Sequence, residues 1–84
     1  MLVVELITRR ACCLCDTAKF VLKRIPIPLQ IQEVDITPPY ASDDLRRLSD
    51  EFTNDIPVVR VNGQVLMKGI IKQQLLEDEL RKFM

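Results

Sequence analysis

Missing residue types limit the chemistry open to this sequence. Its 84 residues include no histidine and no tryptophan, and only 5% of them are aromatic. Without histidine the chain cannot form the Ser-His-Asp or Cys-His arrangements of common hydrolases. Zinc usually takes four nitrogen or sulfur ligands, and the single cysteine cluster here has no second Cys/His cluster to complete such a site. The chemistry left to these residues is therefore that of sulfur, and we expect no internal metal site.

The sequence also lacks an excess of either charge and any long apolar run. Twelve basic residues balance twelve acidic ones, whereas nucleic-acid and anionic-membrane binders normally carry a basic excess. No apolar run approaches the roughly 20 residues that span a bilayer. The short apolar start has no basic segment before it and is followed by Arg9 and Arg10, unlike a signal peptide. We expect a cytoplasmic monomer that binds neither nucleic acid nor membranes.

The pattern of apolar residues predicts one α/β domain over residues 1–84. Apolar spacing of three and four residues is typical of a helix, and Ser42 can cap the second helix. Asn62-Gly63 between two β-rich runs predicts a hairpin. The predicted elements are strand 2–7, helix 13–25, strand 29–36, helix 43–52, strands 58–61 and 64–67, and a helix opening at Gly69. This β-α-β-α-β-β-α order predicts a four-stranded mixed sheet with helices on both faces, a three-layer α/β/α fold.

Cys12, Cys13 and Cys15 are the only cysteines. Cys12 and Cys15 form a Cys-x-x-Cys pair where the first strand meets the first helix. Unpaired N–H groups and a partial positive charge at a helix N-terminus favour a negative sulfur at Cys12, and Arg9 and Arg10 add to this effect. One helical turn brings Cys15 back beside Cys12, so that Cys12 can attack a disulfide and Cys15 can then displace it.

Other uses of the cysteines remain open at this point. A disulfide closing a loop of four residues removes only about 2 kcal/mol of unfolded-chain entropy, which suits a bond that opens and closes better than a staple. The cysteines could instead only fill the base of the helix. Three thiolates without imidazole also suit Cu(I) or a shared iron–sulfur cluster, which would make the protein a metal carrier. A non-catalytic adaptor that kept the fold and lost turnover is the third alternative.

Four segments together resemble glutaredoxins: Thr-Arg-Arg-Ala-Cys-Cys-Leu-Cys-Asp at 8–16, Asp-Ile-Pro-Val at 55–58, the Asn62-Gly63 turn and Gly69. They are most similar to the short glutaredoxin-like branch of the thioredoxin superfamily, whose active-site segment reads Cys-Pro-Leu-Cys-Asp. The resemblance covers almost the whole chain. It implies a thioredoxin-like fold and a thiol–disulfide oxidoreductase. In that enzyme Cys12 would be the nucleophile, Cys15 the resolving thiol, and the peptide before Pro57 would be cis.

The resemblance further implies a substrate-binding set, Arg10, Ile56, Pro57 and Gly69. The implied partner is a disulfide-containing protein or a glutathione mixed disulfide, with no cofactor required and glutathione as a candidate co-substrate. Cys13 stands where the family has proline and adds an accessory thiol. Typical glutaredoxins follow a Gly-Gly pair with an acidic residue, Ser or Thr that holds glutathione. The segment 67–72 has one glycine and no carboxylate, so dithiol chemistry is better supported than glutathione binding.

Overall fold

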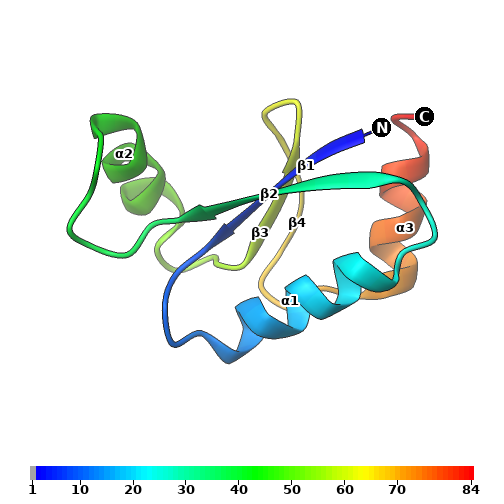
Figure 1. Ribbon diagram of the computed structural model, residues 1–84, viewed down its shortest axis with the longest axis horizontal. Helices are drawn as coiled ribbons and strands as arrows, with labels where there is room; N and C mark the ends of the chain where they lie inside the picture. The colour runs from blue at the N-terminus through cyan, green and yellow to red at the C-terminus, as the bar shows by residue number, and fades with distance from the viewer. Residues whose placement is uncertain (1) are drawn as a thin grey trace.

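The order of helices and strands is the one that the sequence pattern predicts. The computed structural model describes residues 2–84 (Figure 1). Its elements are β1 (Leu2–Thr8), α1 (Cys13–Arg24), β2 (Leu29–Asp35), α2 (Asp43–Phe52), β3 (Val58–Val61), β4 (Gln64–Lys68) and α3 (Gln73–Arg81). Among these residues no helix is long and apolar enough to cross a membrane.

The four strands form one mixed sheet in the order β2-β1-β3-β4, which confirms the predicted topology. β1 pairs with β2 in parallel, and β3 pairs antiparallel with both β1 and β4. The parallel pair leaves the C-terminal ends of β1 and β2 at the same edge of the sheet, where Thr8 lies opposite Asp35. The loops that follow these two strands therefore start side by side.

The two faces of the sheet are covered differently. Val4 and Leu6 point to the face covered by α1 and α3, where they pack against Leu22 and Leu80. Ile7 points to the opposite face, where it packs against Phe52 of α2. Figure 1 shows α2 apart from the other two helices, beyond the C-terminal end of β2. Helices thus lie on both faces, and α2 covers the end of its face that adjoins the cysteines.

Local signals set most element boundaries as expected. Ser42 is the N-cap of α2, and its Oγ accepts a hydrogen bond from the Leu45 N–H at 3.3 Å. The β3–β4 turn places Asn62 at φ 52° and Gly63 at φ 79°. Positive φ at both positions is what a two-residue hairpin turn requires, and Asn and Gly adopt it most readily.

The prediction that the last helix opens at Gly69 is wrong. α3 begins at Gln73, with Lys72 as its N-cap. Gly69 has a φ of 75° and cannot lie in a right-handed helix. Its N–H group instead lies within hydrogen-bonding distance of the Asp55 and Pro57 carbonyl oxygens. Gly69 therefore joins the end of β4 to the loop before β3. Ile71, between Gly69 and the start of α3, is buried in the core.

Candidate active site

Cys12 occupies the predicted position at the start of α1. It is the N-cap residue, with extended backbone angles (φ −115°, ψ 107°). Its Sγ accepts a hydrogen bond from the Cys15 N–H at 3.2 Å, one of the N–H groups that a helix leaves unpaired. The side chain is half-buried and packs against a buried cluster that contains Ile7 and Ile56. Cys12 therefore presents a partly accessible sulfur to a helix N-terminus, where negative charge is favoured.

Cys15 lies one turn along, on the inner side of α1. Only 1% of its surface is exposed, and it packs with Ile7, Phe52 and Ile56. Burial raises the pKa of the Cys15 thiol to about 11, and a side-chain hydrogen bond with Cys12 acts in the same direction. The backbone and the charge of Arg9 act in the opposite direction. The two sulfurs of the Cys-x-x-Cys pair thus lie together in very different surroundings.

Cys13 is the most accessible of the three free thiols. It is the first residue of α1 and is exposed, and its carbonyl oxygen accepts a hydrogen bond from Thr17 Oγ1 at 3.2 Å. Its predicted role as an accessory thiol stays a prediction. Across residues 2–84 no three or more His, Cys, Asp or Glu side chains are grouped so that they could hold a metal ion.

The loop before β3 lies against the cysteines, as the resemblance implies. The Ile56–Pro57 peptide bond is cis, which confirms that expectation. Ile56 belongs to the same buried cluster as Cys15, and Cys12 packs against this cluster. Ile56 and Pro57, 44 and 45 positions beyond Cys12 in the sequence, thus share one end of the molecule with the sulfurs. Their predicted role in substrate binding stays a prediction.

Gly69 adds the end of β4 to this site. Its N–H group lies 3.0 Å from the Asp55 carbonyl oxygen and 2.9 Å from that of Pro57. Lys68 Nζ, next to it, lies 3.5 Å from Asp55 Oδ2. A Cβ at position 69 would meet nothing within 4 Å, so the left-handed backbone and not lack of space requires glycine there. The structure therefore places Gly69 beside the cis-proline loop.

The two adjacent arginines have different surroundings. Arg10 carries an 81% exposed side chain whose Nε lies 3.9 Å from Asp35 Oδ2, and its backbone N–H donates to Thr37 Oγ1 at 2.8 Å. The backbone and the charge of Arg9 lower the pKa of Cys15, against the larger effect of burial. Arg10 was predicted to bind substrate, and both arginines were predicted to favour a negative sulfur at Cys12, whereas Asp35 and Thr37 were not predicted to belong to the site. The signal for Asp35 and Thr37 was the parallel β1–β2 pair, which places the loops after both strands at one edge.

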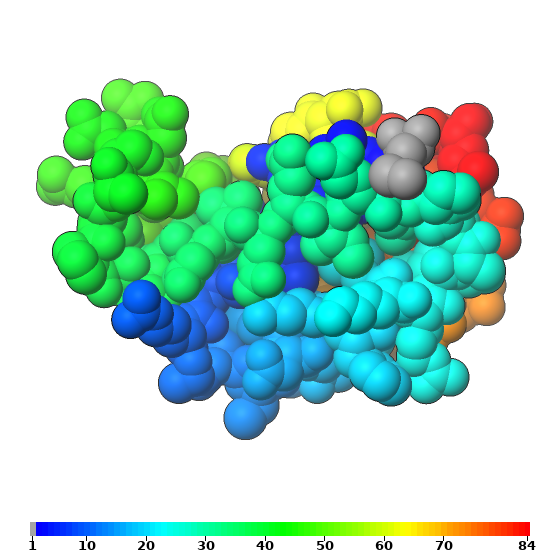
Figure 2. Space-filling model, viewed as in Figure 1, coloured from blue at the N-terminus to red at the C-terminus, as the bar shows by residue number. Residues whose placement is uncertain are grey.

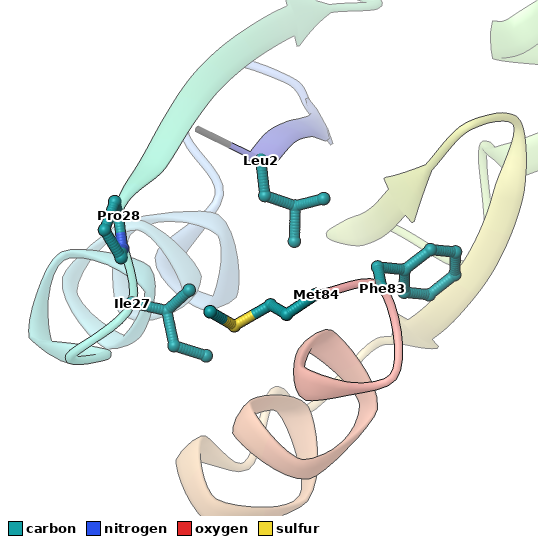
Figure 3. Close-up of a pocket in the computed structure, with 5 residues that line it drawn as sticks. All are labelled: Leu2, Ile27, Pro28, Phe83 and Met84. Carbon is teal, nitrogen blue, oxygen red and sulfur yellow. The ribbon is translucent and has the colours of Figure 1, made fainter.

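A pocket of about 380 Å³ lies where the start of β1, the segment after α1 and the C-terminal residues meet (Figure 3). It is lined by Leu2, Ile27, Pro28, Phe83 and Met84. Leu2 begins β1 and Ile27 follows α1, whereas the cysteines lie at the end of β1 and the start of α1. This apolar pocket is therefore not part of the sulfur site.

The thiol pair and its surroundings suit exchange between thiols and disulfides. A half-buried sulfur at a helix N-terminus is available for attack, and a second, buried sulfur is close enough to displace what the first has bound. Ile56 of the cis-proline loop packs in the same cluster as Cys15, and Cys12 lies against this cluster.

Comparison with known proteins identifies the family and the fold. A solved structure described as that of a malarial protein is similar to this chain with a TM-score of 0.56. The two share 15% sequence identity over 98% of this chain and 96% of that chain, a likeness of fold. The sequence profile of a family described as the glutaredoxin-like domain (DUF836) matches residues 3–84. The chain therefore belongs to the glutaredoxin-like domain family and has a thioredoxin-like fold.

Proposed function

We propose that this protein is a thiol–disulfide oxidoreductase that acts through Cys12 and Cys15. The observation that carries the proposal is the position of the Cys12 sulfur, which accepts the Cys15 N–H at the start of α1 and lies beside the cis-proline loop. Backbone N–H donors favour the negative sulfur that attacks disulfides. The family match supports the fold and a redox role.

The reaction proceeds by two displacements. The Cys12 thiolate attacks one sulfur of the substrate disulfide, so that a mixed disulfide forms and the other substrate sulfur leaves as a thiolate. Cys15 Sγ then attacks Cys12 Sγ, which forms the Cys12–Cys15 disulfide and releases the second substrate sulfur. The proton of Cys15 passes to a departing thiolate. The substrate gains two electrons, and an external thiol reductant returns them to the pair.

Because their surroundings differ, the two sulfurs act in different steps of the reaction. Cys15 is buried and its pKa is raised to about 11, so it stays protonated at neutral pH and out of reach of a large substrate. Cys12 is half-buried and meets the substrate first. Only when a mixed disulfide has formed on Cys12 does Cys15 have an electrophilic sulfur beside it.

The proposed substrate is a disulfide-containing protein or a glutathione mixed disulfide, bound by a monomer in the cytoplasm without a resident cofactor. Residues on the cis-proline loop support the first of these more directly. Ile56 packs beside the sulfurs, and we propose that its backbone pairs with an extended peptide substrate. Lys68, which could attract a glutathione carboxylate, is paired with Asp55, and the segment 67–72 carries no carboxylate of its own.

Single replacements of the cysteines test this function. Cys12→Ser should abolish reduction of a peptide disulfide, because the hydroxyl is not a nucleophile at neutral pH. Cys15→Ser should let the first step occur and accumulate a mixed disulfide on Cys12, which mass spectrometry detects. Cys13→Ser is the matched control and should retain reduction, since the exposed Cys13 is not needed for either displacement.

Activity that survives in Cys12→Ser would contradict the proposal. The metal content of the same preparations separates it from the carrier alternative. A stoichiometric metal that is lost in Cys12→Ser, together with no disulfide reduction by the wild-type protein, would favour a metal carrier.

A further inference from the structure

The turn between β1 and α1 holds an unfavourable backbone conformation next to the nucleophile. Ala11 has a φ of 55°, in the left-handed region that costs an alanine free energy because of its Cβ. The next residue, Cys12, returns to an extended conformation and caps α1. The direction of the Cys12 side chain therefore depends on Ala11 staying left-handed, and contacts outside the turn must hold it there.

Those contacts come from the segment that follows β2. The Arg10 N–H donates to Thr37 Oγ1 at 2.8 Å, across 27 positions of the sequence. One step before this contact, the Ile36 N–H donates to the Thr8 carbonyl oxygen at 2.8 Å and extends the β1–β2 pairing. Figure 2 shows the blue segment that leads into α1 against the green segment after β2. The hydrogen bond from Arg10 to the Thr37 hydroxyl is thus the last one between these two segments before Ala11.

Thr37 is itself held firmly. Its N–H donates to Asp35 Oδ1 at 2.8 Å. The Thr37 side chain is the larger cause and this N–H the second cause of a lowered pKa of Asp35, so the acceptor is a carboxylate at neutral pH. Pro38 follows Thr37 and disfavours a helical conformation at Thr37. Branching at Cβ also restricts the rotamers of threonine. A hydroxyl placed this way is an anchor for Arg10 rather than a mobile surface group.

We propose that Thr37 is a positioning residue for Cys12: its hydroxyl holds the Arg10–Ala11 turn so that the Cys12 sulfur meets the Cys15 N–H. Without the hydroxyl the Arg10 N–H loses its partner, and Ala11 is free to relax from the left-handed region. The Cys12 sulfur then spends less time on the helix N–H donor that favours its negative form. The inference rests on the proposed function only in taking Cys12 as the nucleophile.

The test compares Thr37→Val with Thr37→Ser in the full chain. Valine keeps the shape of threonine without the hydroxyl, whereas serine keeps the hydroxyl. The measured quantity is the rate at which iodoacetamide alkylates Cys12, followed by mass spectrometry across pH 6 to 9 so that the three cysteines are read separately. Thr37→Val should slow this rate at neutral pH by about fivefold, the factor that one hydrogen bond of ordinary strength contributes. Thr37→Ser should restore it to within about twofold of wild type, less than a hydrogen bond's worth.

Three further measurements separate positioning from loss of structure. Thr53→Val makes the same chemical change at an exposed residue of the α2 C-cap and should leave alkylation unchanged. Ala11→Gly removes the cost of the left-handed conformation and, added to Thr37→Val, should recover part of the lost rate even if Thr37→Val lowers the thermal unfolding midpoint. Hydrogen exchange of the Cys15 N–H should speed up in Thr37→Val and not in Thr37→Ser.

Equal alkylation rates in wild type and Thr37→Val, or a Thr37→Ser variant as slow as Thr37→Val, would overturn the inference. Both outcomes are read from the alkylation rate of Cys12, which does not depend on disulfide reduction. If Cys12→Ser keeps its reductase activity while Thr37→Val still slows alkylation, the proposed function fails and the positioning role of Thr37 stands.

Discussion

The two buried clusters on either face of β1 differ in what they are made of. The larger one, under α1 and α3, contains only aliphatic side chains: Val4, Leu6, Ala18, Leu22, Ile25, Ile27, Val59, Val61, Ile71, Leu76 and Leu80. The smaller one, next to α2, includes the Cys15 thiol, and two of its members, Ile36 and Ile56, lie in loops. Its residues are Ile7, Cys15, Ile36, Phe52, Ile56 and Val58. Cys12 packs at the margin of the smaller cluster.

This difference separates stability from chemistry within a small protein. The larger cluster joins strands and two helices through side chains that carry no reactive group, so its contribution is burial of apolar surface. The smaller cluster surrounds the resolving sulfur with Phe52 from α2 and Ile56 from the cis-proline loop. The low polarity that raises the pKa of Cys15 therefore comes from a different set of residues than most of the core.

Leu6 and Ile7 offer the sharpest test of this separation and the largest expected effect. They are neighbours in β1, both 0% exposed, and they point into the larger and the smaller cluster respectively. Truncation of a buried Leu or Ile to alanine costs about 2–5 kcal/mol of unfolding free energy. We expect both Leu6→Ala and Ile7→Ala to lose stability in this range, measured by urea unfolding under reducing conditions.

Only Ile7→Ala should also change the sulfurs. In protein that is still folded, the cavity left by Ile7 should admit water to Cys15 and speed its alkylation, whereas Leu6→Ala should leave that rate unchanged. Equal acceleration of Cys15 alkylation in the two variants would show that both clusters shield the sulfur, and the distinction between them would be lost.

The second prediction concerns pH. The pKa of Cys15 is raised from 9.0 to about 11 in the folded protein, so folding favours the protonated thiol. The stability that this provides is complete below pH 9, where the thiol is protonated in both states, and is lost as pH rises toward 11. The full shift corresponds to about 3 kcal/mol, of which about 2 kcal/mol is lost by pH 11, where the folded thiol is half ionised. Wild type should therefore lose about 2 kcal/mol more unfolding free energy than Cys15→Ala between pH 8 and 11.

The difference between the two proteins is the quantity to measure, because all their other ionisable groups are the same. Urea unfolding at several pH values with reductant present gives it directly. Parallel pH profiles for wild type and Cys15→Ala would mean that burial in the smaller cluster does not affect the ionisation of Cys15.

Features of the sequence that depend on near neighbours were predictable. Apolar periodicity gave the elements, Ser42 and the Asn62-Gly63 pair marked their ends, and the position of Cys12 at the strand–helix junction made it the N-cap. Each of these depends on a few residues whose backbone preferences act locally. The cis bond before Pro57 followed from the family resemblance, since a proline alone gives no reason to expect it.

Features that depend on distant partners were not predictable in the same way. Glycine before an amphipathic segment suggested a helix start at Gly69, but its N–H group lies against carbonyl oxygens of the Asp55–Pro57 loop, which the sequence does not place beside it. The hydrogen bond between Arg10 and Thr37 depends on strand register. An alanine likewise gives no sign of the left-handed backbone that Ala11 adopts.

The smallest predicted effect concerns an ion pair on the face of the sheet to which Ile7 points. Arg60 Nε and Nη2 donate to the two carboxylate oxygens of Glu5 at 3.2 and 3.1 Å, and the residues pair across β1 and β3. The side chains are 18% and 27% exposed, so the pair is shielded more than the exposed Lys82–Glu79 pair on α3. Glu5→Gln keeps the shape and removes the charge, which should cost about 1 kcal/mol of unfolding free energy.

The same replacement also tests whether the Glu5–Arg60 ion pair affects the two sulfurs. Glu5 follows the same alternation as Ile7 and lies two residues before it on the same face, so a loss of stability without any change in Cys12 or Cys15 alkylation is the expected result. This result would show that the face of the sheet that carries Glu5 and Ile7 has two parts. The polar part at Glu5 only joins β1 to β3, and the apolar part at Ile7 shields the Cys15 sulfur. Lys82→Gln is the matched control and should leave the urea midpoint unchanged, since exposed ion pairs contribute little. Faster alkylation of Cys15 in Glu5→Gln would instead extend the shield around the sulfur to the Glu5–Arg60 pair.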